Sequence, residues 1–365
     1  MPVVTLDLPA PAPHRYDIVI EPGALSRLGD LLKDVAPHNR AGLFADARVL
    51  DLHGEAARAS LTDAGYQPAV HGFAAGEDRK RLATAAELYD VAAEHHLERK
   101  SPIVALGGGV AGDLVGMVAA TWLRGVPFVQ CPTTLLAMVD ASVGGKTGVN
   151  LDAGKNLVGA FHQPVLVIAD TDTLATLDDR QLRCGLAECV KHAVIRDADL
   201  FDWIENRGDA LLNRDDAALV ELIERNVRIK AAVVAEDEKE SGVRAHLNFG
   251  HTFAHAIEAI CGYGQFTHGE AVALGMVAAT HLAADEGRIE STLTDRLTAL
   301  LDRLGLPTAA DDLPPADKLL EAMRLDKKVA GDRIRLVLPT RLGAVTLDDN
   351  VADDVILEAW NRIRG

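Results

Sequence analysis

An apolar strand that runs into a glycine-rich turn constrains the fold of this chain more than any other feature. Residues 103–106 are a short apolar run, and residues 107–113 read Gly-Gly-Gly-Val-Ala-Gly-Asp before a helical pattern begins. A short apolar run of this kind is typical of a buried parallel strand. The spacing Gly107-x-Gly109-x-x-Gly112 matches the turn in which backbone N–H groups approach a diphosphate at a helix N-terminus. The segment predicts a strand–turn–helix unit of a parallel α/β sheet.

Strand and helix patterns alternate through the first half of the chain, and this alternation is the pattern of βαβ units. Residues 1–177 are therefore predicted to form an α/β domain with a Rossmann-like parallel sheet. Glycine-rich stretches at 143–148 and 154–156 predict loops or a hairpin. Strands are expected at 15–20, 42–46, 68–71, 103–106, 127–130 and 165–170, and helices at 25–35, 50–64, 76–96, 113–123 and 133–141.

Long helical patterns dominate after about Leu177, so residues 178–365 are predicted to form a mainly α-helical domain. No low-complexity linker separates the two halves, and a cleft between two closely joined domains is a common place for a ligand site. The expected helices are 178–196, 215–235, 245–261, 269–286, 292–304 and 350–363, with one strand pair at 334–338 and 344–347.

The glycine turn lacks one feature of a standard dinucleotide site. The acidic residue expected about 20 positions further on, to bind a ribose, would fall near Gln130, and residues 126–131 contain no acid. Asp46, at the end of a predicted strand, and Glu77 precede the turn and are alternative ribose ligands. A tight strand–helix turn without a nucleotide is the competing interpretation. Further hydroxyl or cationic contacts to a nucleotide are expected from Thr133, Thr134, Lys146 and Lys155.

Three residues of the second half are candidate metal ligands: Glu188, His251 and His268. One carboxylate and two imidazoles, with positions left open for substrate, form a common catalytic ligand set for Zn²⁺ and similar ions. Glu188 stands among apolar residues, where an unpaired carboxylate is costly to bury. A salt bridge to Lys191 or Arg244 would resolve that cost as well as a metal would. Purely structural roles for the histidines are the remaining alternative.

His255 lies four residues after His251 on a predicted helix, so both share one face. It is a candidate ligand, a residue that supports a ligand, or a proton shuttle. Basic and amide side chains crowd the same region, which predicts a small, oxygen-rich, anionic substrate. Glu240 is expected to point inward. The crowding residues are Lys191, Lys230, Arg244 and Asn248.

Charge and composition exclude several function classes. The chain has 37 Lys and Arg against 54 Asp and Glu, a formal net charge of −17, which argues against a nucleic-acid or anionic-membrane surface. Four cysteines without CxxC spacing are expected to be reduced and mostly buried. The N-terminus has no signal-peptide pattern, and no run reaches the roughly 18 apolar residues of a membrane span. A cytoplasmic location is therefore expected.

Taken together, the motifs resemble those of the 3-dehydroquinate synthase family, over essentially the whole chain. The resemblance implies the dehydroquinate synthase-like fold, with an α/β domain followed by a mainly helical domain. It is carried by Gly76-Glu77-x-x-Lys80, residues 107–113, 132–147 and 154–156, Gly185-Leu186-Ala187-Glu188-x-x-Lys191, Leu247-Asn248-x-Gly250-His251-Thr252-x-x-His255-x-x-Glu258, His268-Gly269-Glu270-Ala271-Val272 and Asp326-Lys327-Lys328.

The resemblance assigns site residues by matching positions. It implies Zn²⁺ or Co²⁺ on Glu188, His251 and His268, and a homodimer in which Arg124 reaches the site of the neighbouring subunit. It implies NAD⁺ on Asp46, Glu77, Lys80, Gly107, Gly108, Gly109, Val110, Gly112, Asp113, Thr133, Thr134, Lys146, Lys155, Thr173, Leu174 and Thr176. It implies substrate contacts or catalytic roles for Asp140, Lys146, Asn156, Lys191, Lys230, Glu240, Arg244, Asn248, His255 and one of Lys327 or Lys328.

The implied reaction converts 3-deoxy-arabino-heptulosonate 7-phosphate into 3-dehydroquinate and phosphate, with NAD⁺ used catalytically. Lys146, Asn156 and Lys191 would hold the phosphate, and Lys230 with Arg244 the carboxylate. Three rival interpretations remain. They are an NAD- and metal-dependent polyol dehydrogenase, another sugar-phosphate cyclase whose substrate lacks the carboxylate, and a nucleotide-binding module without catalysis.

Overall fold

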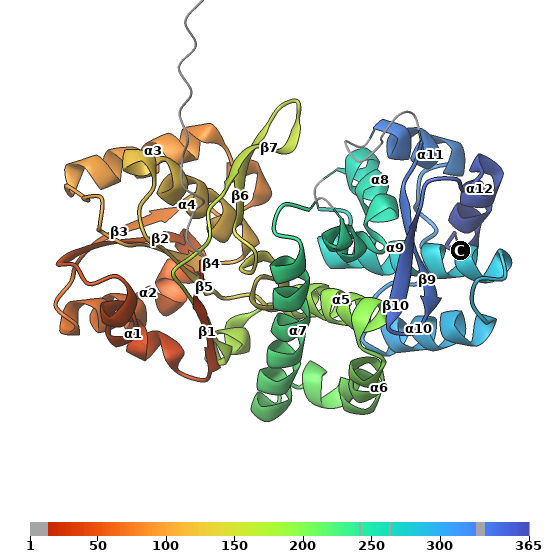
Figure 1. Ribbon diagram of the computed structural model, residues 1–365, viewed down its shortest axis with the longest axis horizontal. Helices are drawn as coiled ribbons and strands as arrows, with labels where there is room; N and C mark the ends of the chain where they lie inside the picture. The colour runs from red at the N-terminus through yellow and green to blue at the C-terminus, as the bar shows by residue number, and fades with distance from the viewer. Residues whose placement is uncertain (1–13, 241, 263, 326–332, 365) are drawn as a thin grey trace, which may run out of the picture.

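The structure is a computed structural model, and it describes residues 14–240, 242–262, 264–325 and 333–364. Figure 1 shows two lobes side by side, a sheet-containing lobe formed by the first half of the chain and a helical lobe formed by the second. The expected α/β domain followed by a mainly helical domain is confirmed. The exact division at 177/178 stays a prediction; in the structure these two residues link η5 (Thr171–Thr176) to α5 (Asp179–Arg196).

A six-stranded parallel sheet in the order β1-β8-β5-β4-β2-β3 forms the centre of the first lobe. β4, β5 and β8 are buried along their whole length, as expected for strands covered on both faces. The strands are β1 (Asp17–Glu21), β2 (Arg40–Asp46), β3 (Gln67–Phe73), β4 (Ile103–Gly107), β5 (Phe128–Pro132) and β8 (Leu166–Asp170).

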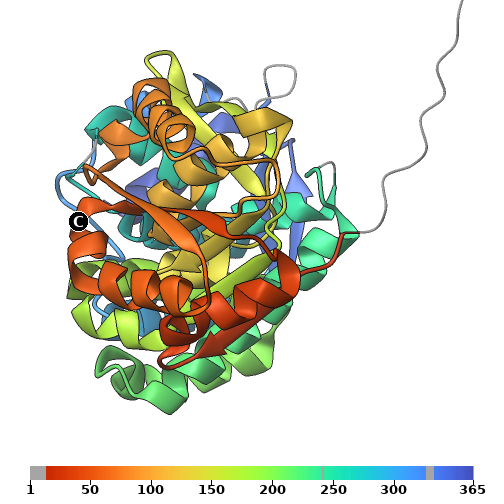
Figure 2. The ribbon, with the colours of Figure 1, turned by 90° about the vertical axis from the view of Figure 1, so that its left-hand side faces the viewer.

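Helices cover both faces of this sheet, as the view in Figure 2 shows. α1 (Leu28–Val35) and α2 (Ala47–Asp63) bury one face, and α3 (Leu82–Glu94) and α4 (Gly109–Thr121) bury the other. Successive strand residues divide between the two cores: Leu43 belongs to the first and Phe44 to the second. The strand order reverses direction between β2 and β4. A crevice at the carboxyl ends of such strands is where open α/β sheets bind ligands.

An antiparallel hairpin, β6 (Lys146–Leu151) and β7 (Gly154–Phe161), extends from the first lobe beside the second. Val149 and Val158 pack it against the core beneath α4. The glycine-rich stretches that predicted loops or a hairpin therefore form a hairpin. A single π-helical turn, η4 (Ala137–Ala141), precedes it where an ordinary helix was expected.

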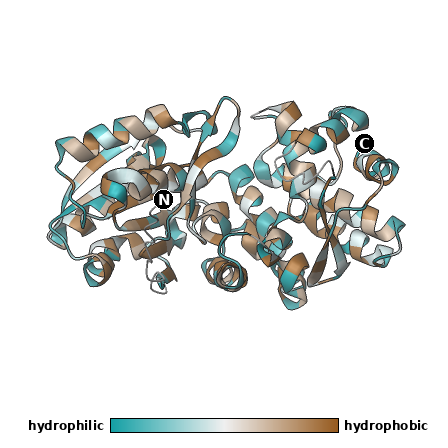
Figure 3. Cartoon of the chain, turned by 45° about the horizontal axis from the view of Figure 1, so that its top comes forward, coloured by the Kyte–Doolittle hydropathy of each residue, from teal (hydrophilic) through white to brown (hydrophobic). Residues whose placement is uncertain are grey.

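The second lobe is built around α9 (His268–Asp285), which is buried nearly all round and contacts α5, α8, α10, α12 and β9. Figure 3 shows mixed hydrophobic and hydrophilic residues on most other helices, the pattern of amphipathic helices around a core. These elements are α6 (Ala198–Leu212), α7 (Asp216–Glu236), α8 (His251–Cys261), α10 (Ser291–Arg303), α11 (Ala316–Leu325), α12 (Asp353–Arg362) and the antiparallel pair β9 (Leu336–Arg341) and β10 (Ala344–Asp348).

Two predicted helices are shorter than expected. The helix expected at 76–96 begins only at Leu82, because Arg81 pairs with Asn150 of the hairpin; η2 (Glu77–Arg79) precedes it. The helix expected at 245–261 is split into η6 (Val243–Asn248) and α8. The split occurs at Gly250, where φ is +76° and a Cβ would lie 2.9 Å from the backbone nitrogen of Met276.

Two short single-turn helices complete the first lobe: η1 (Ala24–Arg27) and η3 (Trp122–Arg124). Within the described ranges, no helix has both the length and the apolar character needed to cross a bilayer.

Candidate active site

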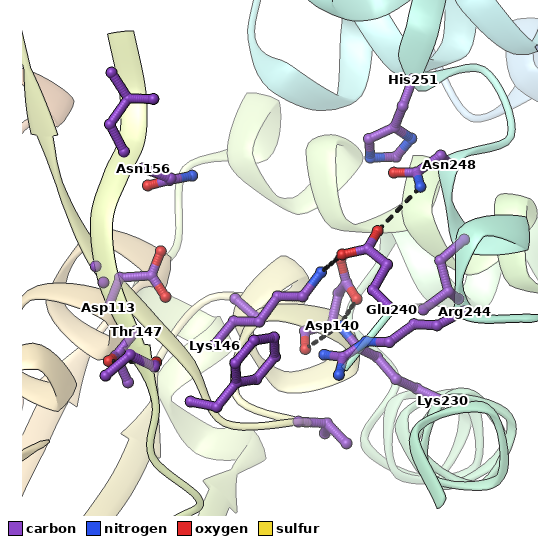
Figure 4. Close-up of a pocket in the computed structure, with 18 of the residues that line it drawn as sticks. Asp113, Asp140, Lys146, Thr147, Asn156, Lys230, Glu240, Arg244, Asn248 and His251 are labelled. Atoms are coloured by element: carbon purple, nitrogen blue, oxygen red, sulfur yellow. Dashed lines mark hydrogen bonds and ion pairs between the residues drawn. The ribbon is translucent and has the colours of Figure 1, made fainter. Parts of the chain in front are cut away.

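A cleft of about 520 Å³ lies between the two lobes. Figure 4 shows side chains of the hairpin on one side facing those of α7, η6 and α8 on the other. Predicted substrate residues form much of its lining, so the fold brings them together from distant parts of the sequence. The residues concerned are Asp140, Lys146, Asn156, Lys191, Lys230, Glu240, Arg244 and Asn248, together with the candidate metal ligand His251 and the candidate cofactor residue Asp113.

The three candidate metal ligands come from three helices and meet at one point. Glu188 lies in the middle of α5, and His251 and His268 are the first residues of α8 and α9. The Nε2 atoms of His251 and His268 are 3.7 and 3.6 Å from Oε1 of Glu188. One ligand atom from each residue lies within 4.8 Å of the other two. An ion with N/O ligands about 2.0–2.2 Å away fits between atoms spaced in this way.

Close helix packing at glycines sets this spacing. A Cβ on Gly269, next to His268, would lie 2.4 Å from the Cα of Cys184, so α9 is in backbone contact with α5. A Cβ on Gly275 would lie 2.1 Å from the carbonyl oxygen of Gly250, which directly precedes His251. Only glycine allows backbones to approach so closely. The two histidines therefore occupy helix starts that are tightly held against their neighbours.

The electrostatics of Glu188 fit a bound cation. Its side chain is fully buried, and burial raises its pKa; Lys191, His268 and His251 lower the pKa by more, so that it lies well below its usual value. The carboxylate is therefore charged. Lys191 donates to Oε2, so the salt bridge considered from the sequence is present. Among the described residues, Oε1 nevertheless has no hydrogen-bond partner. A buried, charged oxygen facing two imidazole nitrogens is the donor set a divalent ion requires.

The other ring nitrogens of the two histidines are held by the protein. Nδ1 of His251 lies 3.2 Å from the carbonyl oxygen of Phe249, and Nδ1 of His268 lies 3.2 Å from Oε1 of Glu258. Such contacts fix the tautomer that leaves Nε2 free to bind a metal. Sequence reasoning quoted Glu258 as part of a motif but assigned it no role. Glu258 follows His251 by seven residues, a spacing that places the two side chains on one face of a helix. This spacing could have indicated that Glu258 lies near the metal ligands.

His192 is a second residue that sequence reasoning assigned no role. It is fully buried, and its Nδ1 lies 3.1 Å from Asn226 Oδ1. Its Nε2 has no hydrogen-bond partner within the described ranges. It forms a possible ligand group with Asp140 and Glu188. In that group, Asp140 already forms an ion pair with Lys230. The group of Glu188, His251 and His268 is therefore the better cation site.

The cations that line the cleft are each paired with an anionic or carbonyl group. Lys146 of the hairpin pairs with Glu240, and Asn248 donates to the same carboxylate at 3.2 Å. Lys230 pairs with Asp140. Burial and the neighbouring Arg244 lower the pKa of Lys230 to about 7. An anionic ligand placed beside Lys230 would favour its charged form.

Arg244 is almost completely buried and binds carbonyl oxygens. It donates to Glu238 and, at 3.3 Å, to Gly144, and its Nε has no hydrogen-bond partner in the part of the chain that the structure describes. Arg244 does not contact Glu188 through any bond or ion pair found among the described residues. Of the two alternative salt-bridge partners predicted for Glu188, Lys191 and Arg244, the structure has Lys191. The unsatisfied guanidinium nitrogen suits Arg244 to an anionic ligand in the cleft.

Two predicted residues within the described ranges, Arg124 and His255, are not among those that line this cleft. Arg124 is exposed on η3, beyond the far end of α4, with φ +70°. His255 lies one helical turn after His251, and the two ring centroids are 5.7 Å apart. Lys327 and Lys328 lie outside the described residues.

The predicted nucleotide residues gather at the carboxyl ends of β2 and β4. Asp46 ends β2 and caps α2, accepting from the backbone N–H of Arg48 at 2.9 Å. Gly107 ends β4 with φ +152°, and a Cβ there would lie 2.7 Å from that of Ala111. The N-terminus of α4, starting at Gly109, opens toward this edge. Asp46 therefore stands where an acid can reach a ribose, across the strand-order reversal from the glycine turn.

The remaining predicted cofactor residues surround this turn. Lys80 donates at 2.5 Å to Asp113 and to Asn156, and burial raises the pKa of Asp113. Asn150 donates to Glu77 at 2.7 Å. Gly108 is covered by Thr134, because a Cβ there would lie 3.1 Å from the Thr134 methyl group. Three more of these residues are buried: Thr133, Thr173 and Leu174. Leu174 has an apolar side chain, so only its backbone could form a hydrogen bond to a cofactor. Thr176 forms a hydrogen bond with His53 at 2.8 Å.

Comparisons with known proteins agree with this geometry. The family model for the 3-dehydroquinate synthase N-terminal region matches residues 71–184, and that for the C-terminal region matches residues 185–329. The chain is 49% identical over 358 residues to a 3-dehydroquinate synthase of Symbiobacterium thermophilum, covering 96% of this chain and 99% of that one.

Two solved structures share the fold over nearly the full length. A 2-epi-5-epi-valiolone synthase from Streptomyces hygroscopicus, with NAD⁺ and Zn²⁺ bound, is 30% identical with a TM-score of 0.90, covering 98% of this chain and 99% of that one. A 2-deoxy-scyllo-inosose synthase with carbaglucose-6-phosphate, NAD⁺ and Co²⁺ is 26% identical with a TM-score of 0.86, covering 94% and 96%. On these matches, the chain belongs to the 3-dehydroquinate synthase family.

Proposed function

We propose that this chain converts 3-deoxy-arabino-heptulosonate 7-phosphate into 3-dehydroquinate and phosphate, a carbon–oxygen lyase reaction that closes a carbocycle. One observation carries the proposal: the buried, unpartnered Oε1 of Glu188 faces two imidazole nitrogens at a cleft lined by Lys146, Lys230 and Arg244. A cation site beside several basic groups suits a substrate that carries vicinal hydroxyls, a carboxylate and a phosphate.

Glu188, His251 and His268 would hold Zn²⁺ or Co²⁺, and the edge formed by Asp46 and the turn at Gly107 would hold NAD⁺. Solved relatives that carry NAD⁺ with Zn²⁺ or with Co²⁺ support this pairing of cofactor and metal. When bound, the metal polarises substrate hydroxyls and NAD⁺ accepts and returns one hydride, so that the cycle has no net redox change.

The residues of the chain bind and orient the substrate. Lys146, Asn156 and Lys191, which all line the cleft, would hold the phosphate. Lys230 on α7 and Arg244 on η6 would hold the carboxylate. Asp140, Glu240 and Asn248 complete the polar lining. The phosphate of the substrate is itself a base close to the proton that must leave, so the site needs no separate strong base for that step.

The assembly proposed for the active enzyme is a homodimer. Arg124 is exposed and lies away from the cleft of its own chain. A contact between Arg124 and substrate therefore requires the cleft of a second copy. Leu123 and Arg124 form a sharp backbone turn, with φ of +50° and +70°.

The function is tested by measuring phosphate release from the heptulosonate phosphate, with trace NAD⁺ and added Zn²⁺ or Co²⁺, while NADH absorbance is followed. We expect many phosphates released per NAD⁺ and no accumulation of NADH. Steady NADH formation from a polyol, without phosphate release, would instead identify a polyol dehydrogenase. NAD⁺ binding without any turnover would identify a nucleotide-binding module.

Another sugar-phosphate cyclase is the closest rival, because both solved relatives described above make other products. Lys230 and Arg244 favour a substrate with a carboxylate. The assay is therefore repeated with heptulose 7-phosphates that lack this group. Faster phosphate release from those substrates than from the heptulosonate phosphate would favour the rival.

Replacing His255 with alanine should slow turnover by about 10²–10⁴-fold while leaving metal bound, because His255 is proposed to move a hydroxyl proton. Its ring lies edge-on to that of His251, outside the group of three ligands. Turnover and metal content are measured on the same preparation. Replacement of the exposed His95 provides a matched control that should change neither. Loss of metal from the His255 variant would make this residue a ligand instead.

A further inference from the structure

Glu258 lies at the point where the metal ligands, the hairpin and α8 meet. Its side chain is 17% exposed, and Oε1 lies 3.2 Å from Nδ1 of His268. Oε2 lies 3.6 Å from Nζ of Lys155. His255, one turn earlier on α8, is the third charged or titratable group that interacts electrostatically with the Glu258 carboxylate. The contact of this side chain with Lys155 enters none of the roles proposed above.

The contact with His268 has a direct chemical consequence. A carboxylate that accepts the Nδ1–H of a metal-binding histidine fixes the ring orientation and makes Nε2 a stronger ligand. His251 has only the neutral carbonyl of Phe249 in the same position. His268 is also the most exposed ligand, at 33% of its side chain, so it has the least packing to hold its ring. The two histidines therefore depend on different supports, and only that of His268 is charged.

The contact with Lys155 crosses between the lobes. Lys155 is on β7 of the hairpin, whereas Glu258 is on α8, and Figure 1 shows these two elements on opposite sides of the gap between the lobes. Lys155 is also a proposed NAD⁺ contact. One carboxylate thus binds a ligand of the proposed metal and a residue of the proposed cofactor site. Loss of its charge would act on both.

We propose that Glu258 is a positioning residue that orients His268 toward the metal and holds Lys155 of the hairpin toward the cofactor. The inference rests on the metal and NAD⁺ binding proposed above. It predicts that metal affinity and cofactor affinity both depend on one side chain that touches neither group.

The test compares Glu258→Gln with the unchanged protein in direct binding measurements. Co²⁺ affinity is measured by competition with a chromogenic chelator, and the Co²⁺ absorption spectrum reports ligand geometry. We expect Glu258→Gln to weaken Co²⁺ binding about 10–100-fold and to alter the spectrum, because the amide keeps the shape of the side chain but not its charge. NAD⁺ affinity, measured by calorimetry on Co²⁺-loaded protein, should also fall.

Matched variants separate the two contacts. Lys155→Met should weaken NAD⁺ binding but leave Co²⁺ affinity within about threefold, because His268 keeps its carboxylate partner. Glu205→Gln removes a carboxylate from an ion pair with Arg296 far from the cleft, and should change neither affinity. If Glu258→Gln fails to fold, Glu258→Asp keeps the charge but shortens the reach, and should show the same losses to a smaller degree.

The outcomes distinguish this inference from the proposed function. Unchanged protein that binds neither Co²⁺ nor NAD⁺ would overturn both. A second outcome would overturn only the positioning role of Glu258. In it, the unchanged protein binds both Co²⁺ and NAD⁺, and the folded Glu258→Gln variant has the same two affinities and the same Co²⁺ spectrum. Equal loss of Co²⁺ affinity in Glu205→Gln would also overturn it, because the effect would then be a general consequence of losing an ion pair.

Discussion

Replacing Glu188 with glutamine should produce a protein that neither retains a divalent metal nor turns over substrate at a measurable rate. The carboxylate supplies the anionic oxygen of the ligand group, and among the described residues its Oε1 accepts no hydrogen bond. The same change leaves the buried Lys191 ammonium without its counter-charge. Removing one partner of a buried ion pair costs about 3–5 kcal/mol. Metal content, turnover and urea unfolding of the metal-free proteins are measured together.

A double variant separates the loss of metal from the loss of stability. Glu188→Leu combined with Lys191→Met replaces both charged side chains with apolar ones, and such replacements are often neutral for stability. The double variant should regain most of the lost free energy of unfolding and still bind no metal. Chelator treatment of the unchanged protein should stop turnover reversibly, with Zn²⁺ or Co²⁺ restoring it. Turnover that survives in Glu188→Gln would contradict the assignment of Glu188 as a ligand.

Replacing Gly269 with alanine should damage the site without altering any group that binds metal or substrate. The added Cβ would lie 2.4 Å from both the Cα and the carbonyl oxygen of Cys184, and neither backbone atom can rotate away. α9 must therefore move from α5, and His268, the adjacent residue, moves with it. Overpacking of this kind costs about 1–3 kcal/mol or more. A displacement near 1 Å costs about 10²-fold in rate.

Gly208 provides the matched control. It is also a buried helical glycine, but a Cβ there would meet nothing closer than the flexible Arg303 side chain at 3.4 Å. Alanine at 208 should be neutral or stabilising by up to about 1 kcal/mol, because alanine is the better helix former. Thermal unfolding, Co²⁺ affinity and turnover are compared for both variants. Unchanged Co²⁺ affinity in Gly269→Ala would show that the α5–α9 contact does not set the ligand spacing.

The sheet could be predicted from sequence because its signals are local. Three apolar runs coincide with strands of the sheet: 42–46 lies within β2, 103–106 lies within β4, and 165–170 overlaps β8 almost completely. Asp46 was expected at a strand end and is the last residue of β2. By contrast, α6 and α11 were not predicted at all. Both are amphipathic helices whose apolar positions contact the rest of the lobe, and tertiary packing stabilises such helices more than propensity does.

Contacts between distant segments were the least predictable part of the site. Glu188, His251 and His268 were recognisable by residue type, but their meeting depends on the contacts of Gly269 and Gly275 with other helices. The break before Leu82 depends on Asn150, which is far away in the sequence. The pairing of Lys155 with Glu258 likewise depends on how the hairpin meets α8. Residue patterns indicate which groups are available, whereas their partners are decided by the fold.

The paired charges in the cleft have a consequence for selectivity. Lys146, Lys191 and Lys230 are each already neutralised by a carboxylate of the chain itself. A small anion such as inorganic phosphate gains little there, because binding it means separating an ion pair that is already formed. A larger ligand that reaches the metal and several of these lysines can replace the carboxylates that pair with those lysines, all in one binding event. We therefore expect the cleft to select ligands by the number and spacing of their negative groups, and released phosphate to compete poorly for it.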